Sequence, residues 1–129
     1  MRTIVTGVAA LALLGGCGPS VQDIRALSPA AERTVDGNYR DVAECMSDWL
    51  THAVEVTERV REQERRATLT GVSSFGPART PVWEIDLVGL GNTTRATLRQ
   101  RPSIWGAGPV GWFEDAVGRC EVAEAHRRP

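Results

Sequence analysis

The sequence lacks lysine altogether and has few histidines, cysteines and aromatic residues. All 15 basic residues are arginine and nearly balance 16 acidic residues, so the formal net charge is −1. A chain without a basic excess gives no reason to expect nucleic acid as a partner or strong electrostatic attraction to anionic lipid. Only two histidines, His52 and His126, are available as metal ligands or general bases.

A hydrophobic run long enough to cross a membrane is also missing at the start of the chain. The apolar stretch 3–14 follows Arg2 and ends at Gly15-Gly16. A transmembrane helix needs about 20 apolar residues, whereas the core of a secretory signal needs only about 7–15. Residues 1–16 therefore predict a signal peptide that is removed from the mature protein.

The residues Leu14-Gly15-Gly16-Cys17 resemble the lipobox of bacterial lipoproteins, in which an aliphatic residue and two small residues precede a cysteine. The resemblance implies that signal peptidase II cuts before Cys17, that diacylglycerol joins its sulfur, and that the new amino group is acylated. Two or more acyl chains hold a protein stably on a bilayer, whereas one chain does so only marginally. The alternative is an ordinary signal peptide, after which Cys17 is a plain thiol.

The residue after this cysteine bears on the choice of membrane. Position 18 is Gly, whereas an aspartate there resembles the inner-membrane retention signal of Gram-negative lipoproteins. The resemblance therefore implies a lipid anchor in the outer membrane, facing the periplasm. The expected partner is the lipid bilayer, reached through acylated Cys17; an envelope protein is a further candidate partner, and nucleic acid is not expected.

Three cysteines leave one unpaired in an exported chain. If Cys17 carries lipid, Cys45 and Cys120 remain as an even pair in an oxidising compartment, where disulfides form. We therefore predict a disulfide between Cys45 and Cys120. Free thiols, or a metal site that also recruits His52 or His126, are the alternatives. We expect no metal and no cofactor.

Composition divides the mature chain into three parts. Residues 17–37 comprise the lipidated cysteine and a segment rich in Pro, Ser and Ala that predicts a tether, residues 38–124 a single α+β domain, and residues 125–129 a polar tail. A flexible chain of 20 residues has an r.m.s. reach of roughly 25 Å. Such a tether would hold the folded domain clear of the lipid headgroups.

Two helices are predicted at the ends of that domain. Apolar residues at helical spacing follow the N-cap candidate Asn38 and predict a helix over 38–52. A second apolar stripe that ends at Cys120 predicts a helix over 110–123. We expect an α+β fold in which an antiparallel sheet of three to four strands carries both helices on one face, where the disulfide links them.

The segments between the helices favour strands. β-Branched residues predict strands at 53–60 and 66–73, separated by a charged turn. Opposite charges at i, i+4 leave a continued helix over 53–65 as an alternative. Strict alternation over 83–99 predicts a hairpin.

Pairing Val88 with Thr93 across that hairpin turns every apolar side chain to one face. The same register sets Asp86 opposite Arg95 on the polar face, with Glu84 diagonal to it. We interpret these charges as stabilising the sheet and keeping the chain soluble.

Motifs that could carry chemistry are weak. The sequence GAGPVG at 106–111 matches a dinucleotide-binding pattern, but too little chain follows to complete the βαβ unit that such a site needs. The adjacent acids Glu114 and Asp115 point to different sides of the predicted helix and cannot face one substrate. We predict no catalytic residue. Trp105, in a Gly/Pro-rich loop beside Arg101, is the best candidate for a recognition surface.

The layout of the domain carries a second resemblance. Tyr39-Arg40 and Cys45 in the first helix, a central hairpin, and Cys120 in the last helix resemble small proteobacterial lipoproteins, which implies no activity. We expect a membrane-anchored lipoprotein of the cell envelope that acts as a non-enzymatic binding or structural module. A small periplasmic enzyme or a carrier of a lipidic ligand is the alternative.

Overall fold

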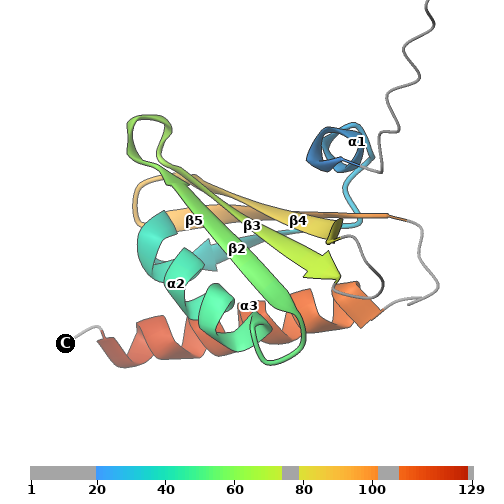
Figure 1. The fold of residues 1–129 in the computed structure, drawn as a ribbon. Coiled ribbons are helices and arrows are strands. Elements are labelled where there is room, and N and C mark those ends of the chain that lie inside the picture. Colours follow the sequence, from blue (N-terminus) through green and yellow to red (C-terminus); the bar gives the residue numbers. More distant parts are fainter. Residues whose placement is uncertain (1–19, 74–78, 102–107, 128–129) are drawn as a thin grey trace, which may run out of the picture.

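The computed structural model describes residues 20–73, 79–101 and 108–127 (Figure 1). These residues form an α+β domain built on one antiparallel sheet. In chain order the elements are α1 (Val21–Arg25), β1 (Ala31–Asp36), α2 (Tyr39–Leu50), β2 (Glu55–Arg61), the 3₁₀ turn η1 (Glu62–Glu64), β3 (Arg66–Ser73), β4 (Thr80–Gly89), β5 (Thr93–Gln100) and α3 (Gly108–Arg127).

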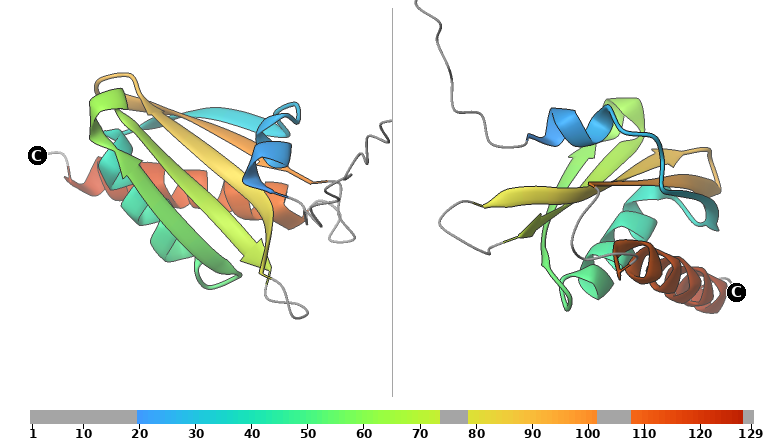
Figure 2. Two further views of the ribbon diagram at one scale, coloured as in Figure 1. Left: turned by 45° about the horizontal axis from the view of Figure 1, so that its top comes forward. Right: turned by 90° about the vertical axis from the view of Figure 1, so that its right-hand side faces the viewer.

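Five strands form the sheet in the order β1-β5-β4-β3-β2, and every neighbouring pair is antiparallel. Helices α2 and α3 lie on one face of the sheet, and the short helix α1 lies on the opposite face (Figure 2). The predicted α+β class is confirmed, but the sheet has five strands rather than three to four. We call the face that carries α1 the open face.

The additional strand, β1, comes from the segment that we expected to be a tether. It pairs with β5 along its whole length, from Ala31 opposite Leu98 to Asp36 opposite Thr93. Val35 is fully buried, whereas the three residues before it are exposed. A strand with so few buried side chains has little alternation in its sequence. Its backbone is ordered by the partner strand, so the folded part begins before residue 38.

Local capping explains where α1 begins. The Ser20 side chain accepts a hydrogen bond from the backbone N–H of Asp23, and the Asp23 carboxylate accepts one from the backbone N–H of Ser20 at 2.8 Å. This reciprocal capping box satisfies two donors that a helix end would leave unpaired. The helix then buries Ile24 against the open face of the sheet.

Helix α2 follows the sequence prediction closely. Asn38 is its N-cap, and the Asn38 side chain accepts hydrogen bonds from the backbone N–H groups of Arg40 and Asp41 at 3.1 and 3.0 Å. The predicted helix over 110–123 is α3, which extends a few residues further at both ends. Each helix turns its apolar stripe towards the sheet.

Strands β2 and β3 settle the alternative left open by the sequence. They pair in register from Glu55 opposite Val72 to Arg61 opposite Arg66, and η1 forms the charged turn between them. Residues 55–61 are therefore strand. The β-branched residues outweigh the i, i+4 charge pairs because β3, a central strand, offers β2 a full set of backbone partners.

The β4–β5 hairpin has the predicted faces but a different register. Leu87 lies opposite Ala96, and Glu84 lies opposite Arg99, a shift of two residues from our prediction. The Leu90 backbone N–H donates to the Thr93 carbonyl at 2.8 Å, so only two residues form the loop. Gly91 takes the positive φ of 94° that such a tight turn requires. A two-residue shift leaves each side chain on its predicted face.

The core lies between the sheet and the two long helices. Apolar side chains from both layers meet there and are almost completely shielded from solvent. The largest members are Trp83, Phe113, Met46, Leu50, Leu69, Ile85, Leu87 and Leu98.

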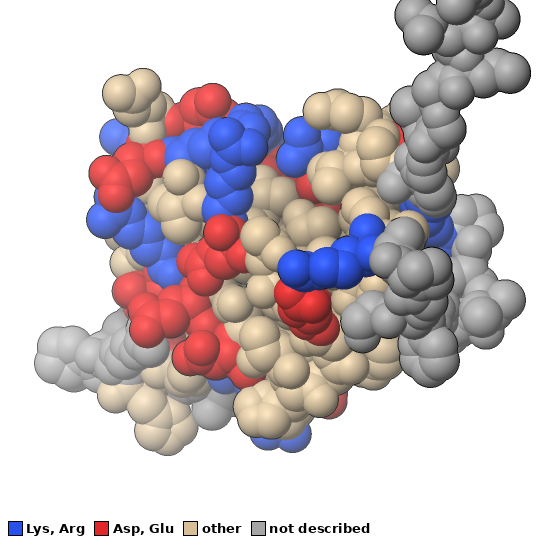
Figure 3. All heavy atoms as spheres, viewed as in Figure 1, with Lys and Arg blue, Asp and Glu red and all other residues tan. Residues whose placement is uncertain are grey.

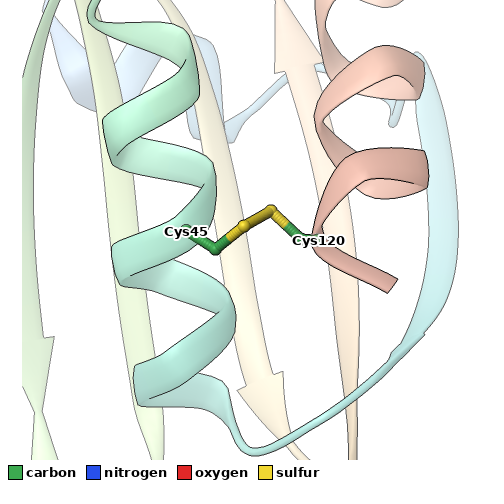
Figure 4. The surroundings of a disulfide bond; sticks show 2 residues. All are labelled: Cys45 and Cys120. Atoms are coloured by element: carbon green, nitrogen blue, oxygen red, sulfur yellow. A yellow bond between two sulfur atoms is a disulfide. The ribbon is translucent and has the colours of Figure 1, made fainter. Parts of the chain in front are cut away.

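The predicted disulfide between Cys45 and Cys120 is confirmed. It joins α2 to α3 on the side of these helices next to the core (Figure 4). The two Cα atoms are 5.8 Å apart, within the usual range for a disulfide. Because 75 positions separate the two cysteines, the bond closes most of the domain into one loop.

Candidate functional site

The most distinctive polar feature of the described residues is a cleft on the open face. Its volume is about 230 Å³, and side chains of α1 and of strands β2, β3, β4 and β5 line it. Alternation along the strands sends polar side chains to this face, because their neighbours enter the core. The lining residues are Arg25, Arg61, Arg66, Thr68, Glu84, Asp86 and Arg99, and we call this set the arginine cleft.

One ion pair fixes α1 to the floor of the arginine cleft. Arg25 Nε donates to both oxygens of Glu84, at 2.9 and 3.2 Å. Glu84 is only 5% exposed, so its carboxylate depends on this partner. The hydrogen bond that Arg25 donates to Glu84 raises the pKa of Arg25 above its ordinary value, and the guanidinium stays charged.

Two further contacts attach α1 and the residues after it to the end of β5. Arg99 Nε donates to the Leu27 carbonyl at 3.1 Å. The Arg101 guanidinium lies 3.7 Å from the carboxylate of Asp23 in α1. Together with the burial of Ile24, these contacts make α1 part of the domain and not of the flexible tether that we predicted.

The charges in the arginine cleft do not cancel. Arg66 Nε lies 3.1 Å from Asp86, and Glu64, outside the lining, lies 3.6 and 3.8 Å from Arg61 and Arg66. Within the described part of the chain, Arg99 has no carboxylate at ion-pair distance. Four arginines therefore share two lining acids, which leaves the cleft net positive. Such an arrangement can hold an anion, because guanidinium groups bind carboxylate and phosphate through paired hydrogen bonds.

The predicted recognition residues are only partly placed. Cys17 and Trp105 lie outside the described residues. Arg101 is half-buried beside α1, and its backbone N–H donates to the Val82 carbonyl at 3.1 Å. The structure therefore brings Arg101 close to the N-terminal helix, next to the arginine cleft.

The two histidines lie on the helix layer, away from the arginine cleft. His52 Nδ1 is 2.9 Å from the Asp48 carbonyl and 3.3 Å from the Trp49 carbonyl, which makes it a cap for the C-terminal end of α2. His126 lies in the last turn of α3 and is exposed. Across the part of the chain that the structure describes, no cluster of three or more His, Cys, Asp or Glu residues could hold a metal ion.

A groove between α2 and α3 is the second polar feature. It runs past the disulfide, and there the Arg119 guanidinium lies over the Trp49 ring, 3.6 Å from its centre. This cation–π contact is typical of an arginine that packs across an exposed aromatic ring. At about 280 Å³ the groove is slightly larger than the arginine cleft, but Arg119 already covers the aromatic ring that a ligand would contact.

The arginine cleft was missed by the sequence analysis. Its residues come from positions 25 to 99, so no local motif marks it. The available signal was the alternation of charged residues in the hairpin, which we interpreted as sheet stabilisation. In the structure Asp86 pairs with Arg66 of β3 and not with the predicted Arg95. The interpretation also does not account for α1, whose contribution depends on tertiary contact.

Comparison with protein-family models, curated proteins and solved structures finds no match for this chain. Among the helices of the described ranges, none is both long enough and apolar enough to cross a membrane.

Proposed function

We propose that the protein is a cell-envelope lipoprotein, anchored through Cys17 in the outer membrane and facing the periplasm, whose domain acts by binding and not by catalysis. The observation that carries the proposal is the sequence Leu14-Gly15-Gly16-Cys17 after a short apolar run. A chain cut at this cysteine would begin with the residue that bears the lipid.

The use of the other cysteines supports the proposal. Cys45 and Cys120 form a disulfide with each other, which leaves Cys17 as the cysteine available for lipid. Disulfides persist in oxidising compartments such as the periplasm. With a lipid on Cys17 and a disulfide between the other two, none of the three cysteines would be a free thiol.

The arginine cleft supports a binding role for the domain. Its four arginines can bind an anion, whereas its two carboxylates are paired with Arg25 and Arg66, and none of the described residues that line it is His, Ser or Cys. His52 caps α2 instead of meeting a nucleophile. A module that contacts an anionic partner at the membrane fits these residues better than a small enzyme does.

Metabolic labelling with palmitate tests the anchor. The wild-type protein should incorporate label and run as the shorter mature form, whereas Cys17→Ser should remain unlabelled and unprocessed. The matched control is the double variant Cys45→Ser/Cys120→Ser, which should still be labelled. Normal labelling and maturation of Cys17→Ser would refute the proposal.

Complementation of a deletion strain tests binding against catalysis. The double variant His52→Ala/His126→Ala should restore the wild-type phenotype, because binding does not need an imidazole. Arg101→Ala, which alters the surface beside α1, should rescue poorly while its thermal unfolding stays cooperative. Loss of rescue by the folded histidine variant would favour the alternative, a periplasmic enzyme.

A further inference from the structure

We infer that the open face of the sheet is turned towards the bilayer and that the arginine cleft contacts phosphate groups of anionic lipid headgroups. The inference rests on the proposed anchor at Cys17. It adds an orientation, a ligand class and a set of contact residues.

The length of chain between the anchor and the domain carries the first step. Helix α1 begins at Val21, only four residues after Cys17. Four extended residues span at most about 14 Å, far less than the 25 Å or so expected of a 20-residue flexible tether. Because α1 lies on the open face, the lipid must approach the domain from that side (Figure 2).

Charge segregation carries the second step. Acidic side chains gather over α2, whereas arginines, with a few acids among them, gather above towards the turn between β2 and β3 (Figure 3). Exposed or half-buried acids lie on the side away from α1: Asp41, Glu44, Asp48, Asp115 and Glu121 on the two long helices, and Glu58 on the β2 face beside them. An anionic surface repels that layer and attracts the arginines of the open face, so both forces favour one orientation.

The open face offers more arginines than those that line the cleft. Arg59 and Arg95 are exposed and, by the strand register, share a face with Thr68 and Val88 next to the cleft. Like Arg61 and Arg66, they lie on the open face near the β2–β3 and β4–β5 turns. A planar guanidinium donates two parallel hydrogen bonds to a phosphate, so these groups suit headgroup phosphates.

Arginine footprinting on the anchored protein tests the inference. The acylated protein is reconstituted into vesicles of phosphatidylcholine with 20% phosphatidylglycerol, and phenylglyoxal modification is followed by mass spectrometry. Relative to detergent micelles, the vesicles should slow modification of Arg61, Arg66 and Arg99 by about threefold or more, with Arg40 and Arg119 on the helix layer unchanged. Equal protection of both layers, or stronger protection of the helix layer, would overturn it.

Two further arms identify the ligand. Pure phosphatidylcholine vesicles should protect the same arginines less, because their surface carries no net charge. Inorganic phosphate added to micelles without vesicles should protect them little. If free phosphate alone gives the full protection, the cleft is a soluble-phosphate site, and the membrane-facing orientation is wrong.

Two double variants with the same change in net charge distinguish specific lipid contact by the cleft from a general effect of protein charge. Arg61→Gln/Arg66→Gln should reduce the vesicle protection of Arg99 at least about twofold, whereas Arg33→Gln/Arg40→Gln, with the same change in net charge, should not. The control side chains are 51% and 54% exposed, somewhat more than the 36% of Arg61 and the 41% of Arg66. Equal loss in both variants would contradict specific contact.

The orientation can fail independently of the anchor. If the palmitate experiment shows no lipid on Cys17, the mature chain can be coupled through that thiol to a maleimide lipid, and the footprint repeated. Protection of the open face would then support the orientation while the natural anchor is rejected. Protection of neither layer on coupled or acylated protein would reject the orientation alone.

Discussion

Gly71 on β3 lies opposite Trp83 on β4, and the Trp83 indole covers the position that a Gly71 side chain would occupy. The ring is only 1% exposed and belongs to the core beneath α2 and α3. The sheet also has a register irregularity between Gly71 and Val72. A glycine is needed here because the backbone and an aromatic ring approach each other closely.

Gly71→Ala should therefore destabilise the domain. Even one methyl group would overlap the Trp83 ring, which cannot move far in a packed core. We expect a loss of about 3 kcal/mol in the free energy of unfolding, measured by urea denaturation. Gly118→Ala is the control, because a Cβ at Gly118 on α3 meets nothing within 4 Å. It should be neutral or slightly stabilising, and equal losses in the two variants would contradict the proposed overlap.

Arg25 should be needed for stability because it neutralises the nearly buried carboxylate of Glu84. Arg25→Gln leaves the nearly buried Glu84 carboxylate without its guanidinium and should cost about 2 kcal/mol. Adding Glu84→Gln should recover part of that loss, since the stranded charge is gone. Urea denaturation of the four members of the cycle measures the coupling. Arg33→Gln breaks an exposed pair with Glu114 and should cost less than about 0.5 kcal/mol; a similar loss would contradict the distinction.

The disulfide should contribute much of the stability of so small a domain. Cys45→Ser/Cys120→Ser opens a loop of 75 positions, for which the chain-entropy estimate is about 4 kcal/mol. We expect the double variant to unfold at a markedly lower temperature than the wild-type protein. In the wild-type protein, alkylation without reductant should modify neither Cys45 nor Cys120. Two freely alkylated thiols in periplasm-expressed protein would contradict the disulfide.

Glu58 should weaken the fold at neutral pH. Partial burial, with the nearby acids Glu44 and Asp48, raises the pKa of Glu58 above its ordinary value of 4.5. Between that value and the raised pKa the folded protein holds a proton that the unfolded chain has lost, so the stability from this group falls as pH rises through the window.

Glu58→Gln should accordingly raise the melting temperature at pH 7 by about 1–2 °C. The gain should shrink as the pH is lowered towards 4.5, where the wild-type side chain becomes protonated. Thermal unfolding followed by circular dichroism across this pH range measures the difference. Glu121→Gln, on the exposed side of α3, is the control. A gain that is the same at every pH would argue against titration of Glu58 as its cause.

Local features of the sequence predicted most elements well. Asn38 begins α2 because its side chain satisfies free backbone donors, which requires only neighbouring residues. Alternation placed β4 and β5, since central strands with one face in the core repeat apolar residues at every second position. The pairing of Cys45 with Cys120 followed from counting cysteines, once Cys17 was assigned to the anchor.

The hairpin register needed information that alternation does not contain. Pairing Leu87 with Thr94 or with Ala96 places the same side chains in the core, so the hydrophobic pattern cannot distinguish the two. The choice depends on the turn, where Gly91 permits a two-residue loop. A two-residue loop with a glycine in its first position could have been favoured from the sequence, and the pairing of Val88 with Thr93, which implied a four-residue loop, was wrong.

The sequence by itself determined the helices, the core-facing alternation and the cysteine count, because capping and periodicity act between residues close in the chain. Only the tertiary structure decided that β1 completes the sheet and that α1 closes over its open face. Those elements have few buried side chains of their own and are ordered by distant partners: Leu98 for β1 and Glu84 for α1. The arginine cleft arises in the same way. The nearly neutral net charge of the chain gives no sign of this cleft, since only folding separates the arginines of the open face from the acids on the helix side.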